Sequence, residues 1–104
     1  MRSIMQEDPD ICYLCGKPVG ATAYGMMDQL EWHHIFEGNP DRKLSERYGL
    51  KVRLHGITCH RDGPNSAHKN QSVYMALMAA GQKAFEREHG TREEFIRTFR
   101  KNYL

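Results

Sequence analysis

The amino-acid sequence predicts a small α+β domain, and three observations lead to this fold class. Residues 30–36 and 50–54 have the composition or the period-two alternation of short strands. Residues 67–89 and the segment after them carry apolar side chains at helical spacing. The chain has 104 residues, 39% of them hydrophobic, which allows one domain with a thin core. Such a core is expected to need a further constraint, such as a bound metal or oligomerisation.

The N-terminal part predicts a polar lead-in and a metal-binding turn. We expect residues 1–10 to be a flexible lead-in to a single domain that spans residues 11–104. No signal-peptide core is visible, and no apolar run approaches the roughly 20 residues of a membrane span, so an intracellular protein without membrane contact is expected. Residues 11–19, ICYLCGKPV, have the Cys-x-x-Cys-Gly pattern of a zinc knuckle, and residues 20–29 are expected to form a loop.

Two strands are expected next, with a turn and a short helix between them. The first strand is Leu30–Phe36, and the glycine, asparagine and proline within Glu37–Asp41 form a strong turn signal. Residues 42–48 can make one or two helical turns that end at Gly49. Residues 50–54 alternate apolar and basic side chains, which predicts a half-buried strand with its basic side outward.

The C-terminal part predicts two helices. Ser66 is a plausible N-cap for a helix over 67–89, after a loop that begins at residue 59, and Gly90 would end that helix. One face of the helix is apolar and should pack inward; it contains Val73, Leu77, Gly81, Ala84 and Phe85. Thr91 and Glu94 have the spacing of a capping box for a second helix. The inward side chains of this helix are expected to be Phe95, Ile96, Phe99 and Tyr103.

The three cysteines indicate a metal site, because an odd number in a reducing compartment argues against disulfides. Cys12 and Cys15 form one pair of ligands, and His55 with Cys59 forms another. Together they can close a tetrahedral site of three sulfurs and one nitrogen, which suits structural zinc and leaves no open position. The alternative is that Cys59 is a buried free thiol and that only the Cys-x-x-Cys turn remains.

Four further histidines predict a second metal site: His33, His34, His60 and His68. Adjacent residues of a strand point to opposite faces, so His33 and His34 cannot both face one metal ion. One of them can bind a metal while the other reaches a substrate from another side. For any single histidine the simpler interpretation is a hydrogen-bonded core or surface side chain, but the grouping favours a functional role.

Charge is distributed unevenly, although the formal net charge is only +2. Residues 1–41 carry seven acidic and two basic side chains, whereas residues 42–61 carry six basic side chains and one acidic side chain. The basic stretch can meet a phosphate backbone, or it can be a solvated surface. The candidates for phosphate contacts are Arg42, Lys43, Arg47 and Arg53.

These motifs resemble those of HNH endonucleases, which share the ββα-metal fold. The similarity begins with Glu31-Trp32-His33-His34-Ile35 and continues through a short strand to Cys59-His60. The short members carried by phages of Gram-positive bacteria resemble this chain over nearly its whole length. Besides the knuckle and the basic strand, the shared segments are HHIF, SERYGL, AHKN and AGQKAFEREHG followed by FIRTFRKNYL.

The resemblance implies a role for each histidine. His34 matches the general base that takes a proton from water, and His33 matches the metal ligand before it. His68 matches the ligand supplied by the helix, and His60 is a third ligand or a phosphate contact. Glu31 stands where some members carry a glutamate that holds the hairpin.

One element of the motif is missing. The middle asparagine falls near Leu50, where this chain has none. Asn39 can replace it from the loop, with Asn65 and Asn70 as weaker candidates.

The expected activity is hydrolysis of DNA phosphodiester bonds with one divalent metal and little sequence specificity. The expected metal in the cell is Mg²⁺ or Mn²⁺, and activity with Ni²⁺, Co²⁺ or Zn²⁺ is also expected, because histidine ligands discriminate little among these ions. Expected partners are DNA and phage packaging or recombination proteins, in the cytoplasm of a bacterial host. The main alternative is a non-catalytic zinc-binding module that binds nucleic acid. Two others are an enzyme that acts only on branched DNA or within a packaging complex, and a module that binds a phage protein.

Overall fold

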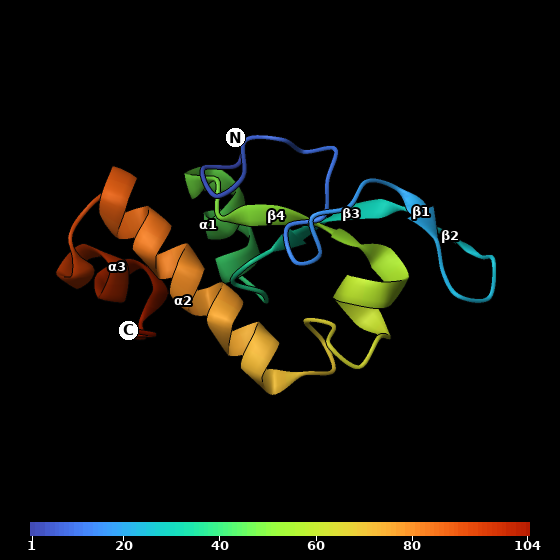
Figure 1. The fold of residues 1–104 in the computed structure, drawn as a ribbon. Coiled ribbons are helices and arrows are strands. Elements are labelled where there is room, and N and C mark those ends of the chain that lie inside the picture. The colour runs from blue at the N-terminus through green and yellow to red at the C-terminus, as the bar shows by residue number, and fades with distance from the viewer.

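A pair of antiparallel strands lies at the centre of the protein. In the computed structural model, which describes all 104 residues, β3 (Leu30–His34) pairs with β4 (Lys51–His55) in a register that sets Leu30 opposite His55. The helix α2 (Gln71–Glu88) runs below this pair, and α3 (Arg92–Phe99) packs beside it (Figure 1). The predicted α+β class is confirmed. No helix has both the length and the hydrophobicity that crossing a bilayer requires.

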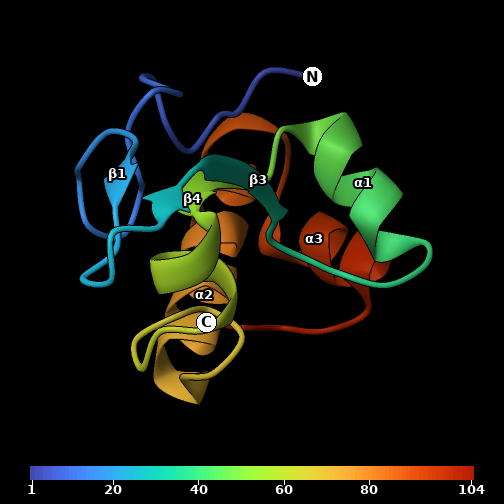
Figure 2. The same ribbon diagram turned by 90° about the vertical axis from the view of Figure 1, so that its right-hand side faces the viewer.

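The connection between the strands contains α1 (Asp41–Tyr48), which lies to one side of the sheet and close to α3 (Figure 2). Gly49 ends this helix with a left-handed backbone, φ 72°, and donates its N–H to Glu46, as the sequence predicted for the helix end. A Cβ atom at Gly49 would collide with the carbonyl oxygen of Arg2. Only glycine therefore fits this position.

Replacing Gly49 with alanine is expected to lower the free energy of unfolding by more than about 2 kcal/mol. The left-handed backbone alone costs roughly 1–2 kcal/mol for an alanine, and the collision with Arg2 adds to it. Gly25→Ala is the matched control, because Gly25 has φ 81° but open space around it. Urea unfolding should show the larger loss for Gly49→Ala, and equal losses would contradict the close approach of the N-terminal segment.

Aromatic side chains form the core between α2, α3 and the end of β3. Phe36 lies 4.6 Å from Phe99 and 5.4 Å from Phe95, measured between ring centroids. The predicted capping box of Thr91 and Glu94 is present at the start of α3. Ile96, which was expected to pack inward, is instead exposed, because it lies on the solvent side of this short helix.

Three segments differ from the sequence-based prediction. The expected loop at 20–29 contains a small hairpin of β1 (Gly20–Ala21) and β2 (Met27–Asp28). The loop expected after β4 begins with a π-helical segment, η1 (Gly56–Arg61). The long helix begins at Gln71 rather than residue 67, because the Asn70 side chain accepts from the Val73 N–H and so caps it.

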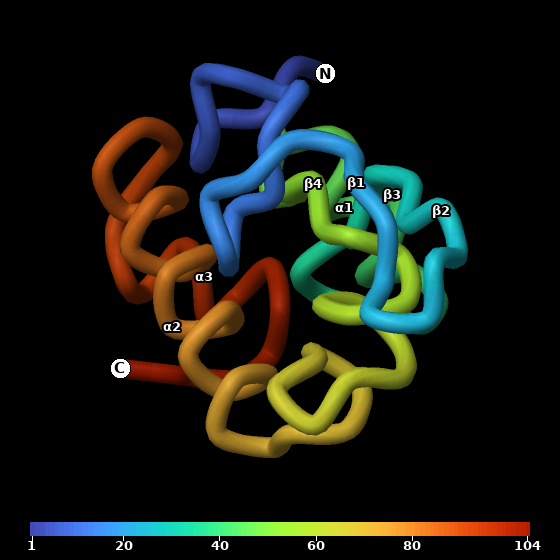
Figure 3. Tube along the Cα trace, turned by 45° about the vertical axis from the view of Figure 1, so that its right-hand side comes forward, coloured from blue at the N-terminus to red at the C-terminus, as the bar shows by residue number.

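The N-terminal segment, expected from the sequence to be a flexible lead-in over 1–10, lies along β4 and makes hydrogen bonds to it. The Ile4 N–H donates to the Gly49 carbonyl at 3.0 Å, and Ser3 Oγ donates to the Lys51 carbonyl at 2.6 Å. The Arg53 N–H donates to Gln6 Oε1 at 2.8 Å. Figure 3 shows this segment lying over β4. The N-terminal segment and Glu46 together cover Lys51. The Lys51 side chain was predicted to face solvent, but it is buried.

Candidate functional site

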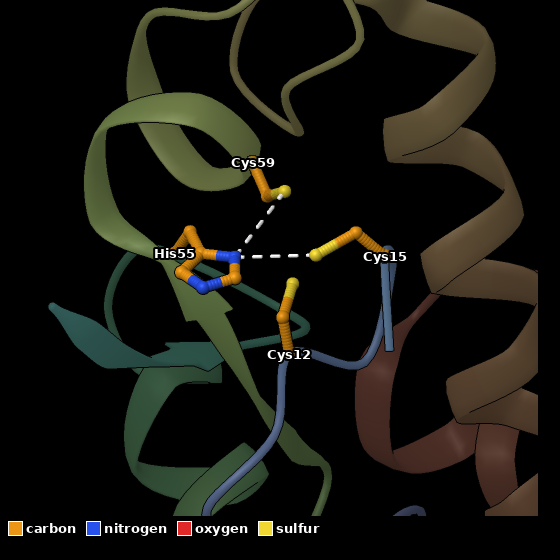
Figure 4. A group of neighbouring side chains, drawn as sticks. All are labelled: Cys12, Cys15, His55 and Cys59. Carbon is orange, nitrogen blue, oxygen red and sulfur yellow. Dashed lines mark hydrogen bonds between the residues drawn. The ribbon is translucent and has the colours of Figure 1, made fainter. Parts of the chain in front are cut away.

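The four residues predicted to bind structural zinc converge in the structure. Cys12 and Cys15 come from the knuckle, His55 ends β4, and Cys59 lies in η1 (Figure 4). Their ligand atoms all lie within 4.8 Å of one another, and His55 Nδ1 is 3.2 Å from Cys15 Sγ. Tetrahedral zinc–sulfur bonds of ~2.3 Å place the sulfurs about 3.8 Å apart. These four residues can therefore hold a structural metal such as zinc.

The surroundings of this cluster orient the His55 ring and shift the pKa values of two of the thiols. His55 Nε2 donates to the Pro18 carbonyl at 2.7 Å, so the lone pair lies on Nδ1, which faces the sulfurs. Burial opposes ionisation of Cys12, but backbone N–H groups, beginning with that of Cys15, lower its pKa to about 7. Burial and then the neighbouring Cys12 raise the pKa of Cys59. A bound cation would favour the thiolate form of both.

A second cluster contains three of the four predicted catalytic histidines: His33, His60 and His68. His33 Nδ1 lies 3.3 Å from His60 Nε2, and Glu37, which was not predicted, joins them with its ligand atom within 4.8 Å of the others. His33 is buried, and burial, followed by the charges of His60 and His68, lowers its pKa to about 3. Its imidazole is therefore neutral near pH 7 and has a lone pair available for a metal.

Glu31 orients His60 toward this cluster. Glu31 Oε1 accepts from His60 Nδ1 at 3.0 Å, so the lone pair of His60 lies on Nε2, the atom that faces His33. Arg61 also pairs with this carboxylate and, with His60, lowers the Glu31 pKa. The resemblance assigned Glu31 a role in holding the hairpin; in the structure it joins β3 to η1 through these contacts. His68 precedes α2 in the loop instead of opening the helix as expected.

His34 lies on the opposite face of the sheet from His33. The register sets His34 across from Lys51, and both contact Glu46 of α1 at 2.9 Å. Glu46 accepts from His34 Nε2, so this nitrogen carries the proton and Nδ1 keeps the lone pair. The N-terminal amino group, then His34 and Lys51, lower the pKa of Glu46 to about 2. The separation of the two histidines follows from strand geometry, as the sequence predicted.

His34 opens into a polar cleft of about 580 Å³ between β3 and α1. The cleft is lined by His34, Gly38, Asn39, Arg42, Lys43 and Glu46. Two of the four predicted phosphate contacts thus lie together beside His34. Arg47 is exposed elsewhere on α1, and Arg53 packs over Trp32 and donates to the Pro9 carbonyl, so neither lines the cleft.

The three asparagines considered as replacements for the missing residue of the motif lie in different places. Asn39 lies in the cleft with His34, where the resemblance required a replacement for the missing residue of the motif. Asn70 caps α2, and Asn65 is within 3.4 Å of the Asn70 amide. Asn39 is therefore the asparagine best placed to act near His34.

Two acidic residues of these sites were missed in the sequence. Glu37 stands four residues after His33, and the chain bends at residues 35 and 36, which brings its carboxylate back over the cluster. Glu46 reaches His34 only because α1 folds back against β3, and no local pattern indicates this. Gly38 and Asn39 line the cleft while Glu37 joins the histidine cluster, so the two sites meet at the turn after β3.

These features define a small α+β domain with a Cys₃His cluster suited to structural zinc and a second, histidine-rich cluster beside a basic cleft. Comparison with protein-family models, curated proteins and solved structures found no match. Arguments about function therefore depend on the geometry of these sites.

Proposed function

We propose that the protein is a DNA endonuclease of the HNH type, in which a zinc-bound ββα-metal core hydrolyses phosphodiester bonds. One observation carries this proposal. Neighbouring residues of β3 point to opposite faces, with His33 in a cluster of ligands and His34 in a cleft with Arg42 and Lys43. Gly38 and Asn39 of the cleft follow Glu37 of the cluster in the turn after the strand, and the proposal requires one phosphate to contact both sides of this turn.

His33, His60 and His68 are proposed to hold one divalent metal, Mg²⁺ or Mn²⁺. When bound, the metal would act as a Lewis acid toward a phosphate oxygen and the leaving 3′ oxygen. Glu31 aims the His60 lone pair inward and His68 is partly exposed, so the cluster can accept a divalent ion from solvent. Three imidazoles suit a transition-metal ion better than Mg²⁺, so Mn²⁺ is the better fit of the two. A partly open cluster leaves room for substrate, unlike the more buried cysteine cluster.

His34 is proposed as the general base. Glu46 holds Nε2, which directs the Nδ1 lone pair away from the carboxylate and leaves it free to take a proton from the attacking water. A carboxylate in this position also stabilises the imidazolium that forms. Arg42 and Lys43, in the same cleft, would hold phosphates of the DNA backbone. Phosphate contacts do not distinguish bases, so little sequence specificity is expected.

A non-catalytic nucleic-acid-binding module is the second candidate, and Glu37 is the observation that favours it. With Glu37 the histidine cluster offers four protein ligands, enough to saturate a tetrahedral zinc ion. In that case the cleft would still bind a phosphate backbone, but nothing would be hydrolysed.

Nicking of supercoiled plasmid across a panel of metals separates the two candidates. An endonuclease should convert supercoiled to open-circular DNA with Mn²⁺ or Mg²⁺ and should be inactive in EDTA. Branched DNA is included in parallel, because a structure-selective enzyme would cut it and spare the plasmid. DNA binding without cleavage of either substrate in any metal would favour the non-catalytic module.

A further inference from the structure

Glu37 occupies the solvent side of the histidine cluster. Its Oε1 atom lies 3.8 Å from His33 Nδ1 and 3.6 Å from His68 Nε2. The side chains of Glu37 and His68 are each 38% exposed, whereas His33 is 1% exposed. The cluster thus has a closed inner side and an open outer side, and the carboxylate lies on the outer side.

Tyr74 fixes the other oxygen of this carboxylate. It projects from α2, and its hydroxyl donates to Glu37 Oε2 at 3.1 Å. A tyrosine hydroxyl is protonated at neutral pH and is therefore a donor toward this carboxylate. The ring also lies edge-on to His33, with centroids 6.4 Å apart. With Oε2 held by Tyr74, Oε1 is directed at the histidines.

We propose that Glu37 is the fourth protein ligand of the histidine cluster and that Tyr74 is its positioning residue. Four protein ligands leave two positions open on a six-coordinate ion such as Mn²⁺ and none on tetrahedral zinc. The coordination number of the bound ion would therefore decide whether the site is active. Mn²⁺ in this site could still accept phosphate oxygens, whereas zinc would already be saturated by protein ligands. This dependence on the metal deepens the proposed endonuclease function, but the ligand assignment does not depend on it.

The assignment is tested by metal binding, which needs no enzymatic activity. The full-length protein is loaded with one equivalent of zinc, which fills the cysteine cluster first because thiolates prefer zinc. It is then titrated with Mn²⁺, and the free ion is measured by electron paramagnetic resonance. Glu37→Gln is expected to weaken Mn²⁺ binding by about 100-fold or more, because a charged ligand is lost. Tyr74→Phe is expected to weaken it about 10-fold, at the lower end of the cost of losing an outer partner. Glu7→Gln and Tyr24→Phe are matched controls on exposed residues and should bind as the unmodified protein does.

Water-proton relaxation gives an independent readout of coordination. Two water molecules are expected on Mn²⁺ in the unmodified protein and three in Glu37→Gln, measured at saturating metal. Mn²⁺ affinity within twofold of the unmodified protein for Glu37→Gln, or an unchanged number of bound waters, would overturn the ligand assignment. Lack of DNA cleavage alongside the expected affinities would instead count against the endonuclease and leave the assignment intact.

Discussion

Replacing His34 with alanine is expected to slow plasmid nicking by a factor of about 10²–10⁴, the usual contribution of a general base. The variant should fold, because Glu46 keeps its contact with Lys51 at 2.9 Å when the imidazole is removed. Metal binding should also persist, since His34 lies on the opposite face of the sheet from the histidine cluster. A selective loss of the chemical step is therefore the expected result.

The measurement is the initial rate of nicking at saturating Mn²⁺, together with a thermal melt and a Mn²⁺ titration of the same preparation. His89→Ala is the matched control, because His89 lies at the end of α2 and donates to the Tyr48 carbonyl, away from the cleft. It should cut at the rate of the unmodified protein. Nicking by His34→Ala at that same rate would exclude His34 as the base.

Much of the fold follows from local patterns in the sequence. The strand pair, α1 with its glycine end and the capping box of α3 each depend on residues within a few positions of one another. The zinc cluster was predicted because Cys12 with Cys15, and His55 with Cys59, are each short-range pairs of ligands. The opposite orientation of His33 and His34 required only the two-residue period of a strand.

The remaining features depend on contacts between distant segments. The N-terminal segment looks like a polar tail in the sequence, and its hydrogen bonds are to backbone groups of residues 49–53, which lie more than forty positions away. Glu46 and Glu37 look like ordinary surface carboxylates until α1 and α2 bring partners to them. The π-helical form of η1 depends on Asp28, which accepts from the Ile57 and Thr58 N–H groups at 2.7 and 3.0 Å.

The two ligand clusters are joined through η1, so a metal held by the cysteine cluster would also help to fix the position of His60. Cys59 and His60 are adjacent in this segment, and one faces the cysteine cluster while the other faces the histidine cluster. Glu31 ties the same segment to β3 through His60. Any change that releases Cys59 should therefore also move His60 relative to His33.

Replacing Cys59 with serine is thus expected to abolish both cooperative folding and Mn²⁺ binding. Structural zinc contributes roughly 10–16 kcal/mol in small zinc domains, which is comparable to the whole stability of a typical domain, about 5–15 kcal/mol. The core of this protein contains 15 buried hydrophobic residues, and a core of this size in a small domain is not expected to fold without a further constraint. The variant should show little cooperative transition on heating.

Circular dichroism melts with and without excess EDTA check this expectation. EDTA should strongly lower the melting temperature of the unmodified protein and should change little in Cys59→Ser, which has already lost its metal. Cys59→His restores a fourth ligand and should recover part of the transition in zinc. The opposite result would be a Cys59→Ser protein with the melting temperature of the unmodified chain and the same decrease in EDTA. It would show that Cys59 is a buried thiol and not a ligand. Mn²⁺ binding by such a protein would then have to be independent of η1.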